Sequence, residues 1–257
     1  FTVGDTAISD ASRPIKAKEA DQAAQNNIQF IEVPVAYDGL SIVVNKENYW
    51  AKEMTVGDLK KIFLADSAVK KWSEVRDGWP DEDIKIFAPG TDSGTFDYFK
   101  EVVAGKTGAI RSDMSVSEDD NVLVRGVAGN PGGIGFFGSA YYFENTDKLN
   151  AVAIINPKSG KAVLPKPDTI ESGEYAPFSR PLFIYVNAEQ ARQPHIKGFV
   201  EFYLDNAGKM AKEVGYVQLP DYLYDRARNK FKTGHTGTHF LNDRGEKVEG
   251  ALPQVYR

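Results

Sequence analysis

The chain has 257 residues, of which 42% are hydrophobic and 26% are charged, and its formal net charge is −5. Its length and composition are those of a globular protein with one large domain or two lobes. The charge is spread along the chain without a basic, aromatic-rich stretch, and no apolar run reaches the roughly 18 residues of a membrane span, which argues against a nucleic acid partner and a membrane-spanning chain.

The first half of the sequence alternates β-branched runs with helical patterns, which predicts α/β architecture. Two successive strands are expected at residues 28–37 and 39–45. Residues 55–63 begin with a threonine suited to helix capping and then space their apolar residues helically. A short strand is expected at residues 84–88 and a helix at residues 95–103.

In the second half, an apolar strand is expected at residues 180–187, and like residues 41–45 it ends in asparagine. Residues 196–204 have helical spacing, whereas the Gly- and Pro-rich segments 126–135 and 156–177 predict loops. Two similar strands so far apart suggest a chain that leaves one lobe, builds a second and returns. Ligands of two-lobed proteins bind between the lobes.

Small and hydroxylic residues fill the segment between the strand at 84–88 and the following helix. A helix starting near Ser93 would leave its first N–H groups unpaired at the positive end of the helix dipole, which is favourable for an anion. The hydroxyls of Thr91, Ser93 and Thr95 would add donors. The alternative is that Asp92 or Ser93 is only a helix cap. A Walker loop is excluded, because its glycine spacing and lysine are missing.

A second candidate anion segment lies near the N-terminus. Ser12 could cap a helix with Pro14 in its first turn, and Arg13 would add a guanidinium. The alternative is a helix cap with a surface arginine. Arg111 lies among hydroxylic and acidic residues. It is interpreted either as an anion ligand or as an exposed loop residue. The consecutive acids 118–120 are interpreted as solvated or capping.

Catalysis and metal binding have little support in the sequence. Without cysteine there is no disulfide, thiolate metal site or cysteine nucleophile. His235 and His239 have metal-ligand spacing for a helix, but the glycines and threonines around them predict a loop with solvated histidines. With His195, these are the only histidines, and none is placed to activate Ser93. The prediction is therefore a binding protein and not an enzyme, with no cofactor.

Together these segments resemble the PstS-type phosphate-binding proteins that feed the phosphate ABC transporter. The matching segments run in the same order over almost the whole chain, up to about Pro220. They are SDASRPIK (9–16), VAYDGLSIVVN (35–45), WSEVRDGW (72–79), GTDSGTFDYF (90–99), SEDDNVLVRGVAG (117–129), GFFGSAYYFEN (135–145) and SRPLFIYVN (179–187).

The resemblance implies a type II periplasmic-binding-protein fold, which has two α/β lobes, a hinge of strands and phosphate in the cleft between the lobes. Lobe I would comprise residues 1–45 and 182–257, and lobe II residues 46–181. It also implies a monomer that delivers inorganic phosphate to a membrane permease. The protein would be periplasmic or extracellular, with or without a lipid anchor.

By the same resemblance, Ser93, Gly94 and Thr95 match the phosphate-binding Ser-Gly-Thr turn of the family. Ser12 matches the serine of its Ala-Ser segment. Two family positions differ, because Pro89 stands where better-known members have an arginine and Arg13 stands where they have the aspartate that accepts a phosphate proton.

The positive charge is therefore expected from Arg13 or Arg111, and the proton acceptor is expected to be Asp10 or Asp92. In the family, an export signal, a first strand, a Ser/Thr-rich loop and a Gly-rich phosphate-contacting turn precede the segment that matches Phe1. The sequence lacks these segments, and a fragment is therefore expected. Residues 233–257 match no family segment and are expected to form a polar surface tail.

Three other functions remain open at this point. The chain could bind another oxyanion or an organophosphate, because its arginine and aspartate positions are altered. It could be a phosphatase with Ser93 as nucleophile, which would need a general base. It could have a surface or scaffold role without anion affinity.

Overall fold

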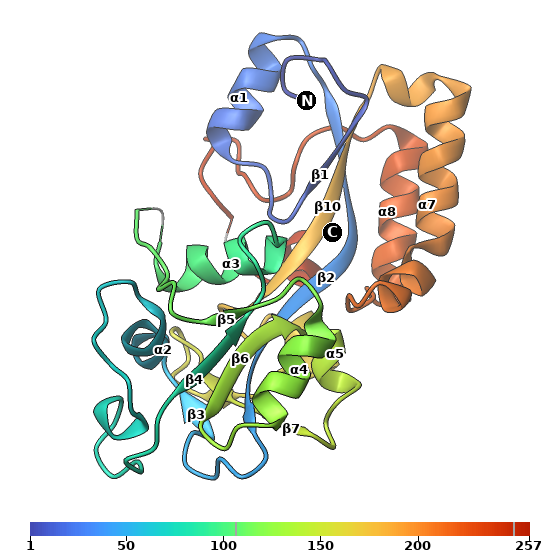
Figure 1. Ribbon diagram of the computed structural model, residues 1–257. Helices are drawn as coiled ribbons and strands as arrows, with labels where there is room; N and C mark the ends of the chain where they lie inside the picture. The colour runs from blue at the N-terminus through green and yellow to red at the C-terminus, as the bar shows by residue number, and fades with distance from the viewer. Residues whose placement is uncertain (106, 249) are drawn as a thin grey trace. The chain divides into compact units, whose positions relative to one another are not determined.

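The computed structural model describes residues 1–105, 107–248 and 250–257 (Figure 1). These residues form two compact units, each containing helices and strands, which confirms the predicted α/β class. Unit 1 contains residues 1–38, 171–173 and 180–257, and unit 2 contains residues 39–170 and 174–179. Among the described residues, no helix has the length and apolar character needed to cross a bilayer.

Unit 1 is built on three strand segments. Strand β1 (Ile8–Ala11) pairs antiparallel with β10 (Ser179–Asn187), and β10 lies between β1 and β2 (Phe30–Asn45) in the strand order. Helix α7 packs along α8, as Figure 1 shows. The helices of this unit are α1 (Ala17–Gln25), η2 (Gln190–Arg192), α7 (Pro194–Glu213), α8 (Asp221–Thr233) and α9 (Leu252–Val255).

Strand β2 is continuous and runs from unit 1 into unit 2, so the prediction of two separate strands was wrong. All sixteen of its residues are buried. The break was expected at Asp38-Gly39, but Arg180 of β10 donates to Asp38 Oδ2 through Nε and Nη2, both at 3.1 Å. A buried carboxylate is tolerated when a partner compensates its charge, so the strand continues through this position.

In unit 2, the main sheet places β6 between β2 and β4 and ends at β5, while β7 also pairs with β2. Its strands are β4 (Lys85–Ala88), β5 (Ser115–Val116), β6 (Gly133–Gly138) and β7 (Leu149–Ala151). A smaller sheet contains β3 (Glu53–Met54), β8 (Ala153–Ile155) and β9 (Ala162–Val163). The helices are α2 (Val56–Phe63), η1 (Trp72–Glu74), α3 (Gly94–Val103), α4 (Asp120–Ala128), α5 (Ser139–Phe143) and α6 (Pro167–Glu171).

Local signals predicted some of these elements and missed others. The cap of α2 is confirmed, because Thr55 Oγ1 accepts from Asp58 N–H at 3.1 Å. The predicted loops 126–135 and 156–177 were wrong in part, since they contain the end of α4, the start of β6, and β9 and α6. Gly135 was misread as a loop signal. It belongs to a strand, where a Cβ would lie 2.8 Å from the carbonyl oxygen of Phe87.

Helix α3 is anchored by an aromatic core in unit 2. The ring of Phe99 stacks on Phe136 with centroids 3.8 Å apart and contacts Phe63 at 4.7 Å. Phe99 and Phe136 have no solvent exposure. This core fixes the position of the first turn of α3.

Replacing Phe99 with alanine is expected to lower the free energy of unfolding by about 3–5 kcal/mol, because it leaves a large cavity in this core. Urea unfolding measures the effect. Val122→Ala is the control, because Val122 is 42% exposed, and its effect should be far smaller. Equal losses in the two variants would contradict this account of the core.

The segment after α8 is part of the fold, so the prediction of a polar surface tail was wrong. Phe240, Leu252 and Tyr256 are buried, and Gly237 N–H donates to the carbonyl of Phe30 at 2.8 Å. The sequence signal here is weak, because the apolar residues of this segment are few and scattered, although Phe240, Leu252 and Tyr256 enter the core.

His239 in this segment gives a pH prediction. Burial, with smaller contributions from Lys230 and His235, lowers the pKa of His239 from its ordinary 6.5 to about 4. Below pH 6.5 the unfolded chain takes up this proton first, so the free energy of unfolding should fall as the pH drops from 6.5 towards 4.

In His239→Gln this component of the pH dependence should be missing, as measured by urea unfolding at several pH values. The matched control is His235→Gln at an exposed position, which should keep most of the wild-type pH dependence. The interpretation fails if His239→Gln loses stability with falling pH as steeply as the wild type.

Candidate functional site

The segment between β4 and α3 is a turn that ends at the helix N-terminus. Ser93 N–H donates to the carbonyl of Gly90 at 3.1 Å, and Ser93 Oγ accepts from Thr95 N–H at 3.2 Å. Ser93 is therefore the N-cap of α3, and the predicted helix start is confirmed. As a cap, this hydroxyl uses an acceptor lone pair and keeps its own hydrogen for donation, so capping and anion binding are compatible.

The start of α3 is open to an approaching ligand. Gly94 is exposed, and a Cβ added to it would meet no atom within 4 Å. The first N–H groups of a helix have no partner inside the helix, and the dipole makes this end positive. Thr91 lies exposed in the same turn and Thr95 is half-buried. This turn brings together the predicted donors Thr91, Ser93, Gly94 and Thr95.

The acidic side chain of Glu118 lies beside this turn, which the sequence did not reveal. A Cβ on Gly90 would clash with Glu118 Oε1, so this exposed carboxylate lies directly against the turn and would have to shift if position 90 carried a larger residue. Asp119 caps α4, as the sequence indicated, because its Oδ1 accepts from Asn121 N–H at 2.9 Å. Burial, with smaller contributions from Asp119 and Glu118, raises the pKa of Asp120 to about 6. Any anion at this turn must therefore tolerate nearby negative charge.

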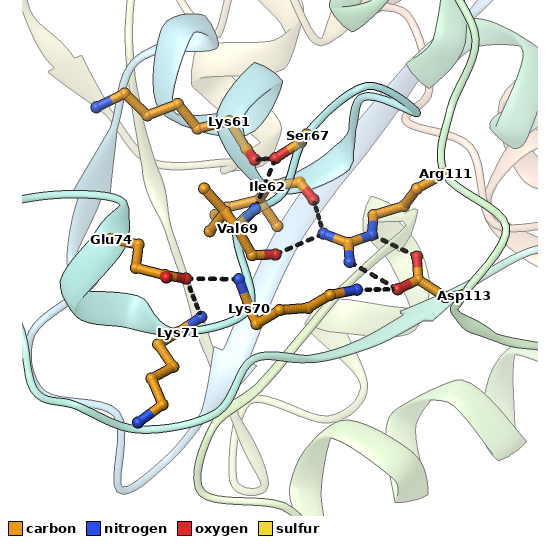
Figure 2. Close-up of polar contacts among 9 residues, drawn as sticks. All are labelled: Lys61, Ile62, Ser67, Val69, Lys70, Lys71, Glu74, Arg111 and Asp113. Atoms are coloured by element: carbon orange, nitrogen blue, oxygen red, sulfur yellow. Dashed lines mark hydrogen bonds and ion pairs between the residues drawn. The ribbon is translucent and has the colours of Figure 1, made fainter.

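Arg111 has protein partners on both sides (Figure 2). Its Nε and Nη2 donate to the two carboxylate oxygens of Asp113 at 2.6 and 2.7 Å, and its Nη1 donates to the carbonyls of Ile62 and Val69 at 3.0 and 2.8 Å. The side chain is only 7% exposed. These contacts tie two loops of unit 2 together, so the geometry gives Arg111 a structural role and does not favour the predicted phosphate contact.

Asp113 balances this charge. Its hydrogen bond to Arg111 is the main cause that keeps the pKa of Asp113 well below its usual range, and Lys70 contributes a second ion pair. Figure 2 shows Lys70 reaching the same carboxylate that faces Arg111. The sequence signal for this pair is the acid two residues after the arginine, which is one of several acids and hydroxyls around Arg111.

In unit 1, the segment around Ser12 lines a cavity of about 490 Å3, together with Asp10, Arg13 and Tyr185. Asp10 is exposed on β1, and Ser12 is half-buried just after it. The prediction that Ser12 caps a helix was wrong, because α1 begins at Ala17 with Lys16 as N-cap. The backbone stays outside the helix because the Ile15 N–H is held by the Tyr185 hydroxyl at 2.8 Å.

Arg13 forms a bidentate pair with Glu19 of α1. Its Nη1 and Nη2 lie 2.9 and 2.7 Å from the two carboxylate oxygens. This hydrogen bond is the main cause that lowers the pKa of Glu19 to about 2. Arg13 is therefore a partly neutralised cation at the edge of the cavity, and its predicted role with phosphate remains a prediction.

The histidines give no indication of a metal site. Within the described part of the chain, no three His, Cys, Asp or Glu side chains gather to hold a metal ion. The rings of His235 and His239 stack with centroids 6.2 Å apart, and His195 lies in the first turn of α7.

Comparison with known proteins places the chain in a family. Residues 1–207 match the model of the PBP superfamily domain. The SphX protein of Synechococcus elongatus is 46% identical over 93% of this chain and 71% of its own length. The phosphate-binding protein PstS of Staphylococcus haemolyticus is 40% identical over 87% of this chain and 69% of its own length.

A solved structure agrees with these relatives. The crystal structure of a possible phosphate-binding protein from Planctomyces limnophilus has a TM-score of 0.87 and 44% identity, covering 91% of this chain and 83% of that one. The predicted resemblance is thus confirmed, and the chain belongs to the PBP superfamily, in the family of the PstS and SphX proteins.

Proposed function

We propose that this chain is a binding protein, not an enzyme, that holds inorganic phosphate reversibly and delivers it to the membrane permease of an ABC importer. It would act as a monomer in the periplasm or outside the cell. Residues 1–45 with 182–257 would form one lobe and residues 46–181 the other. The family membership supports this function, and the observation that carries it is the open N-terminus of α3 at Ser93-Gly94-Thr95.

The N-terminus of α3 has the chemistry that phosphate needs. Backbone N–H groups and hydroxyls donate to the phosphate oxygens, and the helix dipole favours the negative charge. Such a site needs no net basic field, which fits a chain with a formal charge of −5. Asp10, Ser12 and Arg13 of unit 1 are proposed as further ligands, because they line one cavity together.

Protonation would distinguish phosphate from sulfate. Near neutral pH phosphate still carries a proton, whereas sulfate has none, so a carboxylate acceptor favours phosphate and repels sulfate. Asp10 and Asp92 are the proposed acceptors, and both are exposed near the candidate ligands of their own unit.

Calorimetric titration tests the ligand class. Phosphate is expected to bind and sulfate to leave the titration unchanged even in large excess, because sulfate offers no hydrogen to the carboxylate. Competition by sulfate would favour the alternative of a general oxyanion receptor. Absence of binding by either anion would contradict the proposed function.

The position of the anion is tested by a charge at Gly94. Gly94→Asp is expected to weaken phosphate binding about 100-fold or more, because a carboxylate a few ångströms from a dianion repels it strongly. Folding should be unaffected or improved, since an acidic residue in the first turn interacts favourably with the helix dipole.

Gly94→Asn is the matched control, because it adds a side chain of the same size without charge, into space where a Cβ meets no atom within 4 Å. Thermal unfolding of both variants confirms that they are folded. If the Asp and Asn variants bind phosphate equally well, the anion does not bind at the start of α3.

A further inference from the structure

The proposed ligands Ser12 and Arg13 lie on a short segment outside helix and strand. It runs between the end of β1 at Ala11 and the start of α1 at Ala17. A buried backbone N–H group in such a segment needs a hydrogen-bond partner, and a fixed partner restrains the segment. In the loop Ser12–Ile15, the N–H of Ile15 has such a partner.

The partner is the hydroxyl of Tyr185 on β10. It accepts from Ile15 N–H at 2.8 Å and lies 3.0 Å from Glu32 Oε2, to which it donates. Both contacts are buried, and Tyr185 is only 4% exposed. The hydroxyl hydrogen is committed to the carboxylate, so its lone pairs are directed towards the loop.

Glu32 in turn is held by the segment that follows α8. The residue has no solvent exposure. Besides Tyr185, Thr238 Oγ1 donates to its Oε2 at 2.6 Å, and His239 N–H donates to its Oε1 at 3.1 Å. Three donors fix the orientation of the carboxylate, and buried hydrogen bonds of this kind rigidify their surroundings.

A buried lysine supports the same network. Lys230 is 6% exposed, its Nζ donates to the carbonyl of Gly237 at 3.1 Å, and it lies 5.2 Å from the centre of the Tyr256 ring. Its charge attracts Glu32 and opposes the effect of burial on that carboxylate. The segment after α8 is therefore bound to Glu32 by hydrogen bonds, and Lys230 of α8 adds an electrostatic attraction to the same carboxylate.

We propose that Tyr185 and Glu32 are positioning residues for the loop Ser12–Ile15, and that residues 238–239 act on this loop through them. The inference rests on the proposed function, because Ser12 and Arg13 are taken as ligands of phosphate. Neither Tyr185 nor Glu32 needs to touch the anion; they keep the loop in the conformation that binds it.

The test compares two tyrosine variants. Tyr185→Phe removes the hydroxyl that holds the loop. Tyr256→Phe is the matched control, because Tyr256 is 1% exposed and its hydroxyl donates to the main-chain oxygen of Glu32 at 3.0 Å. Both variants lose one buried hydroxyl at Glu32, but only the first loses the contact with Ile15.

Hydrogen exchange at the Ile15 amide is the direct readout, because a purely structural loss would affect both variants alike. Exchange should be about tenfold faster in Tyr185→Phe than in Tyr256→Phe, and phosphate should bind about 5- to 10-fold more weakly, as expected for one lost buried hydrogen bond. Urea unfolding measures the global stability of each variant, so that the exchange rates of the Ile15 amide can be corrected for any difference in stability.

A milder variant covers the case in which Tyr185→Phe does not fold. Thr238→Val removes one donor to Glu32 and leaves Tyr185 in place. It should speed the exchange of the Ile15 amide and weaken phosphate binding, both by less than Tyr185→Phe.

Equal Ile15 exchange in the two tyrosine variants overturns the proposal, as does wild-type phosphate affinity in Tyr185→Phe. If Tyr185→Phe does not fold, wild-type exchange in Thr238→Val overturns it. If the wild-type protein binds no phosphate, the proposed function fails separately, and the exchange rates still decide whether Tyr185 holds the loop.

Discussion

The fully buried carboxylate of Glu32 constrains the arrangement of unit 1. Burying an ionisable group is costly, and burial raises the pKa of Glu32. Donors from β10 and from the segment after α8 offset this cost by hydrogen-bonding to the carboxylate. Tyr185 connects this carboxylate to the N–H of Ile15. The hydrogen bonds that satisfy Glu32 in the core therefore also restrain the loop that carries Ser12 and Arg13.

In unit 2, the proposed phosphate site is the N-terminus of α3 and not an arginine. Arg111 is committed to Asp113 and two carbonyls, and in unit 1 Arg13 is paired with Glu19. A ligand at the start of α3 would therefore be bound mainly by N–H groups and hydroxyls. With Glu118 against the turn, this site would suit an oxyanion that still carries a proton.

The sequence predicted the features that depend on residues close together in the chain. Thr55 was predicted as a cap, and Ser93 was one of two candidate caps of its helix, because a cap bonds within two or three residues. The resemblance to the PstS family covered seven segments and led to the Ser-Gly-Thr turn. In these cases the signal and its cause lie close together in the chain.

Features that depend on distant residues were missed. Strand β2 passes through Asp38 because of Arg180, and the segment around Thr238 is drawn into the core by Glu32. The Ser12 cap failed because the Tyr185 hydroxyl holds Ile15 outside the helix. None of these partners can be identified from periodicity or composition.

A crystal structure of the chain with bound phosphate tests the central claim most directly. The account predicts phosphate oxygens within hydrogen-bonding distance of the Gly94 N–H and of the Ser93 and Thr95 hydroxyls. Phosphate bound only elsewhere, or an empty α3 N-terminus at saturating phosphate, would contradict it.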